Sequence, residues 1–294
     1  MEQLSAESMD GWRTTVEQFK DLILSSEEYR EHLFATSEHE RTHVFELTRG
    51  DVKLVYFGTS HTNNPDDPIF EDIQKIFRAL QPDMVYVEGQ EYINDKKESV
   101  RKHMQEVSVA ESKVQGEHRF TLHLATESGA DFESPEPNPQ AEITDLLGEG
   151  FSREDIFRFY IYRGIDQYQR HHDSRSADEC IEYLKGHVQR FEEDSRWESG
   201  EISEFFERVS RDLDVGDMKK YHEQVDPIPW EHSPETVINL ISRRSSLFRD
   251  LHIFERIASG LKTHKRIFVV YGATHAVKQE PAFRALMGNA NKSI

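Results

Sequence analysis

Three short runs of consecutive apolar residues constrain this sequence more than any other feature. They are Leu54–Phe57, Met84–Val87 and Phe268–Tyr271. Short, continuously apolar runs that are rich in β-branched and aromatic residues are typical of strands buried on both faces. Segments with helical periodicity separate the three runs, and this alternation favours a parallel sheet covered by helices. The sequence therefore predicts an α/β fold, with a mostly parallel central sheet flanked by helices.

Other segments predict the remaining elements of this core. β-rich runs on either side of Arg49-Gly50-Asp51 predict a hairpin, and Ala130–Glu133 predicts a further strand. A last helix is expected to begin near Glu280, just before Pro281. Helical periodicity predicts the other helices at Gly11–Phe34, Ile69–Leu80, Asn94–Val107, Phe120–Ser128 and Glu235–Leu261.

The middle of the chain has a different composition. From Glu142 to about Tyr221 it is charged, helical in pattern and poor in strand signals, and the Pro-rich stretch Val225–Pro234 follows. We interpret residues 1–141 as the N-terminal half of the α/β core and residues 142–224 as a helical insertion. Residues 225–294 complete the core. The insertion is expected to cap the sheet.

The net charge narrows the classes of partner, and the cysteine content excludes an internal disulfide. The chain has 294 residues, and its 36 Lys and Arg against 55 Asp and Glu give a net charge of −19. Such a charge repels nucleic acid and anionic membranes, so a small-molecule or peptide substrate is expected, with a homo-oligomer possible. A single cysteine, Cys180, permits no internal disulfide. With no signal peptide and no run of ~20 apolar residues, a cytoplasmic location is expected.

Two of the apolar runs end in the same motif. Leu54–Phe57 leads into Gly58-Thr-Ser-His61, and Phe268–Tyr271 leads into Gly272-Ala-Thr-His275. With 15 Gly and 15 His in the chain, chance alone gives about one Gly-x-x-His match, so the placement carries the prediction. Glycine lets the chain turn sharply at the carboxyl edge of the sheet, where open α/β sheets bind ligands. The alternative is two unrelated histidines that make local hydrogen bonds.

An acidic residue ends the third apolar run. Glu88 follows Val87 and is expected at the same edge. Beside two neutral imidazoles it could complete a metal site of the His₂Glu type, or act as a general base. A solvated acid at the start of a loop is the alternative. Glu133, Glu136 and Glu117 are weaker candidates for the same crevice.

These residues together resemble a known group, the TraB/TIKI superfamily, which is similar to the erythromycin esterases and to haem-binding ChaN-like proteins. The resemblance rests on the two Gly-x-x-His motifs, on Glu88 and on the pair Arg249-Asp250, and it covers about residues 43–140 and 235–290. It implies a role for Arg249, whose guanidinium could hold a carboxylate or stabilise an oxyanion. Without the resemblance, Arg249 would be interpreted as a surface helix residue.

The leading functional hypothesis is a hydrolase that acts on an ester or amide bond. His61, Glu88 and His275 would bind a divalent metal ion that activates water. In a metal-free version, one histidine would be the base, oriented by a carboxylate. The second hypothesis is a binding protein whose two histidines hold haem iron or a small ligand without catalysis. The third is a degenerate, structural member of the group.

Overall fold

The computed structural model describes residues 18–36, 42–89, 92–171, 178–185, 188, 200–210, 218–229 and 233–288. The chain divides into two compact units. The first comprises Met1–Glu136 and Asp250–Ile294, and the second comprises Pro137–Arg249. Both ends of the chain therefore build the first unit, and the second unit takes in the predicted insertion together with the first half of the long helix that follows it.

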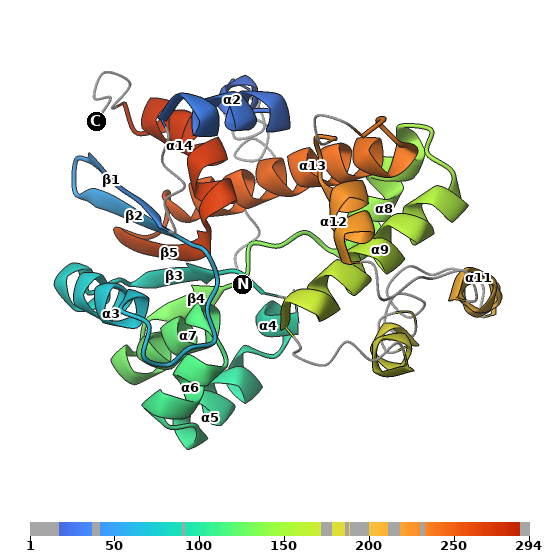
Figure 1. The fold of residues 1–294 in the computed structure, drawn as a ribbon. Helices are drawn as coiled ribbons and strands as arrows, with labels where there is room; N and C mark the ends of the chain where they lie inside the picture. The colour runs from blue at the N-terminus through green and yellow to red at the C-terminus, as the bar shows by residue number, and fades with distance from the viewer. Residues whose placement is uncertain are drawn as a thin grey trace. The chain divides into compact units, whose positions relative to one another are not determined.

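The first unit is built on a five-stranded sheet with the order β1-β2-β5-β3-β4 (Figure 1). β1 pairs with β2 antiparallel, and the pairs β2–β5, β5–β3 and β3–β4 are parallel. The predicted α/β fold with a mostly parallel sheet is confirmed. The strands are β1 (His43–Arg49), β2 (Val52–Thr59), β3 (Met84–Val87), β4 (Asp131–Glu133) and β5 (Arg266–Gly272).

Helices surround this sheet in the first unit. Those in the N-terminal part of this unit are η1 (Lys20–Leu22), α2 (Ser26–Thr36), α3 (Ile69–Leu80), α4 (Tyr92–Asp95), α5 (Lys97–Glu106), α6 (Val109–Val114) and α7 (Glu117–Ser128). α14 (Ala273–Leu286) follows β5, and the long helix α13 (Val237–Gly260) contributes its residues 250–260.

The predicted hairpin is confirmed. Arg49 and Val52 face each other across the antiparallel pair, and Gly50 and Asp51 form the loop. Gly50 has φ 62°, a left-handed conformation that glycine adopts without a steric penalty. Tight turns of this kind match the twist of the two strands and fix their register.

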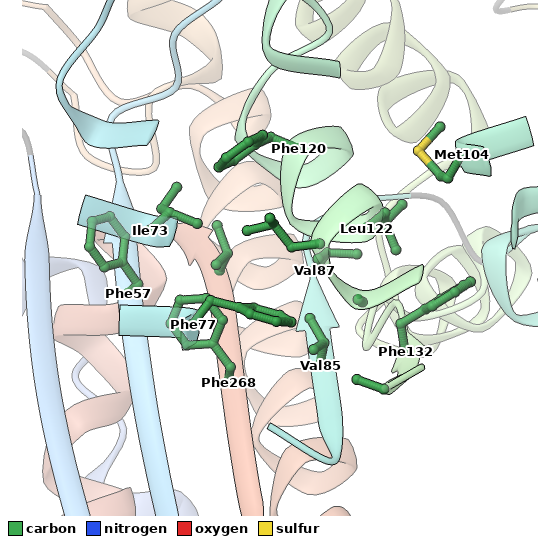
Figure 2. Packing of buried hydrophobic residues seen from close by; sticks show 14 of the residues in the cluster. Phe57, Ile73, Phe77, Val85, Val87, Met104, Phe120, Leu122, Phe132 and Phe268 are labelled. Carbon is green, nitrogen blue, oxygen red and sulfur yellow. The ribbon is translucent and has the colours of Figure 1, made fainter. Parts of the chain in front are cut away.

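One face of the sheet is covered by α3, α5 and α7. Figure 2 shows this core, in which strand residues such as Val85, Val87 and Phe268 meet Phe77 of α3 and Phe120 of α7. All five are buried. The apolar stripe of α3 explains why the sequence predicts this helix correctly, since its buried residues recur at helical spacing and Pro82 follows its end.

The opposite face carries the C-terminal part of α13 and α14. Strand residues Tyr56, Tyr86 and Val269 pack there with Phe254 of α13 and Phe283 of α14. Successive side chains of a strand point to opposite faces, so one continuous apolar run supplies both cores. Runs such as Leu54–Phe57 are therefore apolar at every position.

Gly58 allows α14 to lie close to β2. A Cβ atom at Gly58 would lie 2.7 Å from Cβ of Ala276, 2.9 Å from Cα of Ala273 and 2.9 Å from the carbonyl oxygen of His43. Real Cβ atoms essentially never approach other heavy atoms below 3.0 Å. Gly58 lies within β2, paired with His43 and Tyr271, so the sharp turn predicted at this glycine is wrong and its role is to let α14 pack closely.

The last helix begins seven residues earlier than the predicted start near Glu280. α14 starts at Ala273, directly after β5, and contains Pro281 in its interior. Proline is favoured at the first position of a helix, but Pro281 lies in the third turn of α14. Inside α14, Pro281 lacks only the hydrogen bond that its N–H would make four residues back. His275 therefore lies in the first turn of a helix and not in a loop.

Further helices also differ from the sequence prediction. The structure describes only part of the predicted helix Gly11–Phe34. In that part, a separate helix, α2, begins at Ser26. Its start is fixed because the side chains of Ser25 and Glu28 each accept a hydrogen bond from the other's backbone N–H. Asn94–Val107 is divided into α4 and α5. Helix α6 was not predicted; it begins at a capping box formed by Ser108 and Glu111.

The described part of the second unit is helical. Its apolar core includes Ile143, Phe157, Tyr221 and Ile241. The cysteine, Cys180, is buried in this core, and burial raises the pKa of its thiol to about 11. The unit contains α8 (Pro139–Gly148), α9 (Arg153–His171), helical residues 178–185, α11 (Glu201–Ser210), α12 (Met218–Val225) and residues 237–249 of α13.

Among the described residues, none of the helices is both long enough and apolar enough to span a lipid bilayer.

Candidate functional site

Three neighbouring parallel strands end at one edge of the sheet, and their ends carry the predicted residues. Gly272 lies beside Thr59 at the ends of β5 and β2, and Val87 of β3 pairs with Val270 of β5. His61 and Glu88 come just after β2 and β3, and His275 lies three residues past the end of β5.

Gly272 lies at the point where these side chains converge. A Cβ atom on Gly272 would lie 3.3 Å from Glu88 Oε2, 3.3 Å from His61 Nε2 and 3.6 Å from His275 Cδ2. The two imidazoles and the carboxylate are therefore neighbours around one backbone position. The structure thus brings His61, Glu88 and His275 together, as the matched strand ends led us to expect.

His275 is oriented by a carboxylate from another helix. Its Nδ1 lies 2.6 Å from Oδ1 of Asp250, which is on α13 and 0% exposed. An ionised carboxylate only accepts hydrogen bonds, so Nδ1 is the donor. This leaves Nε2 of His275 as the ring nitrogen that can accept a proton. The ring of Tyr271 packs edge-on against the imidazole, with centroids 5.1 Å apart.

Asp250 is held ionised inside the protein. Lys278 Nζ donates to Oδ2 at 2.5 Å, and Gln279 Nε2 donates to Oδ1 at 2.9 Å. Burial by itself raises the pKa of the Asp250 carboxyl, but His275 and Lys278 together outweigh burial and hold that pKa well below its ordinary value. In the sequence, Asp250 was noted only as the neighbour of Arg249. A signal was present, since a carboxylate stands in the apolar stripe that continues with Ile253 and Phe254.

His61 lies between two carboxylates. Its Nε2 is 3.4 Å from Oε2 of Glu88, and its Nδ1 is 3.9 Å from Oε2 of Glu117. The backbone of His61 has φ 59°, which is uncommon for a residue with a side chain. The next residue, Thr62, donates its backbone N–H to Oε1 of Glu117 at 2.7 Å. The loop after β2 is thus tied to the start of α7.

Glu88 also caps a helix. Its Oε2 accepts a hydrogen bond of 2.8 Å from the backbone N–H of Gly272, the residue that precedes α14. Carboxylates are stabilised at helix N-termini by the unpaired N–H groups and the helix dipole. Glu88 therefore joins the end of β3 to the start of α14, and the same oxygen faces His61.

Glu117 and His118 lie at the start of α7; Glu117 was only a weak candidate in the sequence, and His118 was not predicted. α7 begins at Glu117, three residues before the predicted start, so both residues lie in its first turn. Glu117 was a weak candidate, yet its buried carboxylate contacts the loop at His61 and Thr62. Burial, reinforced by Arg119, lowers the pKa of His118 from 6.5 to about 4, although Glu88 and Glu117 act in the opposite direction. His118 is thus neutral at neutral pH.

Glu133, the last residue of β4, and Glu136, which follows the strand, have different partners. The hydroxyl of Tyr271 donates a hydrogen bond to Glu136, and the ring of Tyr271 contacts His275. Glu136 therefore reaches the candidate site through Tyr271. Glu133 instead forms an ion pair with Arg256 of α13, with a bond of 2.8 Å from Nε, and this pair ties β4 to the helix.

Arg249 precedes Asp250 on α13 and is the last residue of the second unit. Within that unit its charge acts on the phenol of Tyr160. Burial raises the pKa of Tyr160 well above its ordinary value, and Glu142 adds to this, whereas Arg249 and Arg163 oppose it. The role of Arg249 at an oxyanion stays a prediction.

The predicted metal centre requires His61, Glu88 and His275 to bind one ion. In the part of the chain that the structure describes, no group of three or more His, Cys, Asp or Glu side chains is arranged to hold a metal ion. His61 Nε2 and Glu88 Oε2 approach each other, but Oε2 already accepts from Gly272. The divalent metal ion bound by His61, Glu88 and His275 therefore stays a prediction.

Comparison with protein-family models, with curated proteins and with solved structures finds no match to this chain. The resemblance to the TraB/TIKI superfamily accordingly stays a prediction that rests on the quoted motifs.

Proposed function

We propose that this protein is a hydrolase that cleaves an ester or amide bond with two histidines, one as a general base and one as a general acid. The observation that carries the proposal is the hydrogen bond of 2.6 Å from His275 Nδ1 to the buried carboxylate of Asp250. A carboxylate in that position holds the imidazole in one tautomer and stabilises the imidazolium that forms when Nε2 takes a proton.

His275 acts as the general base. Its Nε2 removes a proton from a water molecule, and the water oxygen forms a bond to the carbonyl carbon of the substrate. The electron pair of the carbonyl bond moves to the carbonyl oxygen. The positive charge that develops on His275 is balanced by Asp250, which is already ionised and needs no reorganisation.

His61 acts as the general acid. Oε2 of Glu88 and Oε2 of Glu117 lie near its two ring nitrogens, at 3.4 Å and 3.9 Å. When the tetrahedral intermediate collapses, the bond from carbon to the leaving oxygen or nitrogen breaks and His61 donates a proton to that atom. The products are a carboxylic acid and an alcohol or amine.

The test uses a panel of p-nitrophenyl esters of increasing acyl length and matching p-nitroanilides. We expect hydrolysis by the wild type and a fall of kcat by about 100-fold to 10,000-fold in His275→Gln and in His61→Gln. His103→Gln removes an exposed imidazole on α5 and serves as the control. A wild type inactive on the entire panel, or site variants as fast as the control, would contradict the proposal.

Metal analysis decides between the two versions of the hydrolase. In the metal-free version, the purified protein contains no stoichiometric metal and EDTA leaves kcat unchanged. Stoichiometric metal that is lost in Glu88→Gln, together with inactivation by EDTA, would replace the acid–base scheme by metal-activated water. A Soret band that appears on adding haem and disappears in His275→Gln would instead favour the binding protein.

A further inference from the structure

The side chains around Asp250 form a buried arrangement that the proposed reaction does not by itself require. Asp250 is 0% exposed, Lys278 is 2% exposed and Gln279 is 0% exposed. Lysine is almost never fully buried unless it is paired, and a buried charge must be compensated. Lys278 and Gln279 follow His275 by three and four residues, so both lie on the same face of α14 as His275. All three side chains reach the same carboxylate on α13.

We propose that Lys278 and Gln279 are positioning residues, which hold the Asp250 carboxylate in the orientation that fixes the tautomer of His275. The inference rests on the proposed role of His275 as the base. Oδ2 of Asp250 is engaged by Lys278, and Oδ1 is shared by His275 and Gln279. These bonds restrict rotation of the carboxylate about its χ2 angle.

The orientation matters because only one tautomer of His275 can act as the base. With the proton on Nδ1, Nε2 carries the lone pair that accepts a proton from water. If Lys278 were replaced by an apolar residue, Oδ2 would be buried with one donor fewer, and the carboxylate would be expected to turn toward another donor. Oδ1 would then leave Nδ1 of His275, and both tautomers would be populated.

The competing interpretation is an ion pair that only ties α13 to α14. α14 offers a matched control for that case, because Arg284 forms a partly buried ion pair with Glu280, which also contacts His43. Arg284 does not contact Asp250 or His275. Arg284→Met therefore removes a cation from the same helix without touching the carboxylate that orients the imidazole.

The experiment compares Lys278→Met and Gln279→Met with Arg284→Met and the wild type. Long-range ¹H–¹⁵N correlation of protein labelled with [¹⁵N]histidine reports the tautomer of His275, assigned with His275→Gln. Asp250→Asn provides the reference for a disturbed tautomer. Kinetics on the p-nitrophenyl esters are measured in parallel, and near-UV circular dichroism confirms folding.

We expect His275 to carry its proton on Nδ1 in the wild type and in Arg284→Met. In Lys278→Met, and to a smaller degree in Gln279→Met, we expect a mixture of tautomers. The expected fall in kcat for Lys278→Met is about 100-fold with KM little changed, since misplaced catalytic groups reduce turnover by this order.

Folded variants with the proton on Nδ1 and kcat within twofold of the wild type would overturn the inference. If Lys278→Met does not fold, Gln279→Met decides by the same two readouts, and if neither folds the residues are a structural tie and the inference is wrong. If the wild type hydrolyses none of the esters, the proposed function fails, whereas the tautomer measurement still decides whether Lys278 positions Asp250.

Discussion

Each imidazole of the site differs from the others in the charges that surround it. His275 has one buried carboxylate at Nδ1, and His61 has a carboxylate near each nitrogen. His118 has Glu88 and Glu117 in its vicinity, yet burial dominates and keeps it neutral. Three histidines at one sheet edge thus have three different environments, and these environments, more than the residue type, determine what each can do.

The pKa of His118 predicts an effect of pH on stability. Its pKa is about 4 in the folded protein and near 6.5 in the unfolded chain, so the unfolded state binds more protons between these values. The free energy of unfolding is therefore expected to decrease as pH falls from 6.5 to 4, and this loss should be smaller in His118→Gln.

Urea unfolding of the wild type and His118→Gln at pH ~7 and pH ~5 measures the difference. The gap is the difference in the free energy of unfolding between the two proteins. We expect it to shift by about 1 kcal/mol between the two pH values, such that His118→Gln is relatively more stable at the lower pH. A gap that is the same at both pH values would show that His118 has no depressed pKa.

The glycines of the two motifs make room for different neighbours. Gly58 allows α14 to approach β2, whereas Gly272 leaves room for Glu88 and His61 at the start of α14. We expect Gly58→Ala to lower the free energy of unfolding by about 1–3 kcal/mol, the usual range for overpacking. Gly272→Ala is expected to fold but to hydrolyse esters more slowly, because its Cβ would lie 3.3 Å from both site atoms.

Gly148→Ala is the control for both variants, since a Cβ at Gly148 would meet nothing within 4 Å. Urea unfolding and ester hydrolysis are measured for all three variants. The assignment of the two glycines would be wrong if Gly58→Ala were as stable as Gly148→Ala, or if Gly272→Ala retained the wild-type kcat.

α13 carries both Asp250 and the predicted oxyanion group, Arg249. Under the hydrolase hypothesis, Arg249→Lys folds normally but loses transition-state stabilisation, because lysine cannot form a fork of two hydrogen bonds to the substrate. The expected loss in kcat is on the order of 100-fold or more, the scale for one oxyanion donor. A wild-type rate would refute the role, and unfolding would indicate that Arg249 stabilises the second unit.

At the scale of the whole molecule, the dominant feature is the net charge of −19. Self-repulsion of like charges destabilises a compact state, and salt screens it within a Debye length of ~8–10 Å. We therefore expect the melting temperature to rise between low ionic strength and ~0.5 M salt, equally in NaCl and choline chloride. A melting temperature that stays constant or falls would show that favourable ion pairs outweigh this repulsion.

Local patterns in the sequence were sufficient to predict the sheet and the edge at which His61, Glu88 and His275 meet. Continuous apolar runs identify buried strands because both faces of such strands are covered, and glycine with a polar residue marks where each strand ends. Since parallel strands end at one edge, His61, Glu88 and His275 were expected as neighbours, and the structure brings them together. The hairpin at Gly50 and helix α3 were likewise predictable from turn and periodicity signals.

Only the tertiary structure decided which groups surround those residues. Asp250, Lys278 and Gln279 belong to two helices, and they meet His275 because α13 and α14 pack on the same sheet face. No local pattern encodes the rotation of one helix against another, since it depends on how side chains such as Phe254 and Phe283 fit together. The sequence therefore determined where the candidate site lies, and helix packing determined which charges and hydrogen bonds surround His275 there.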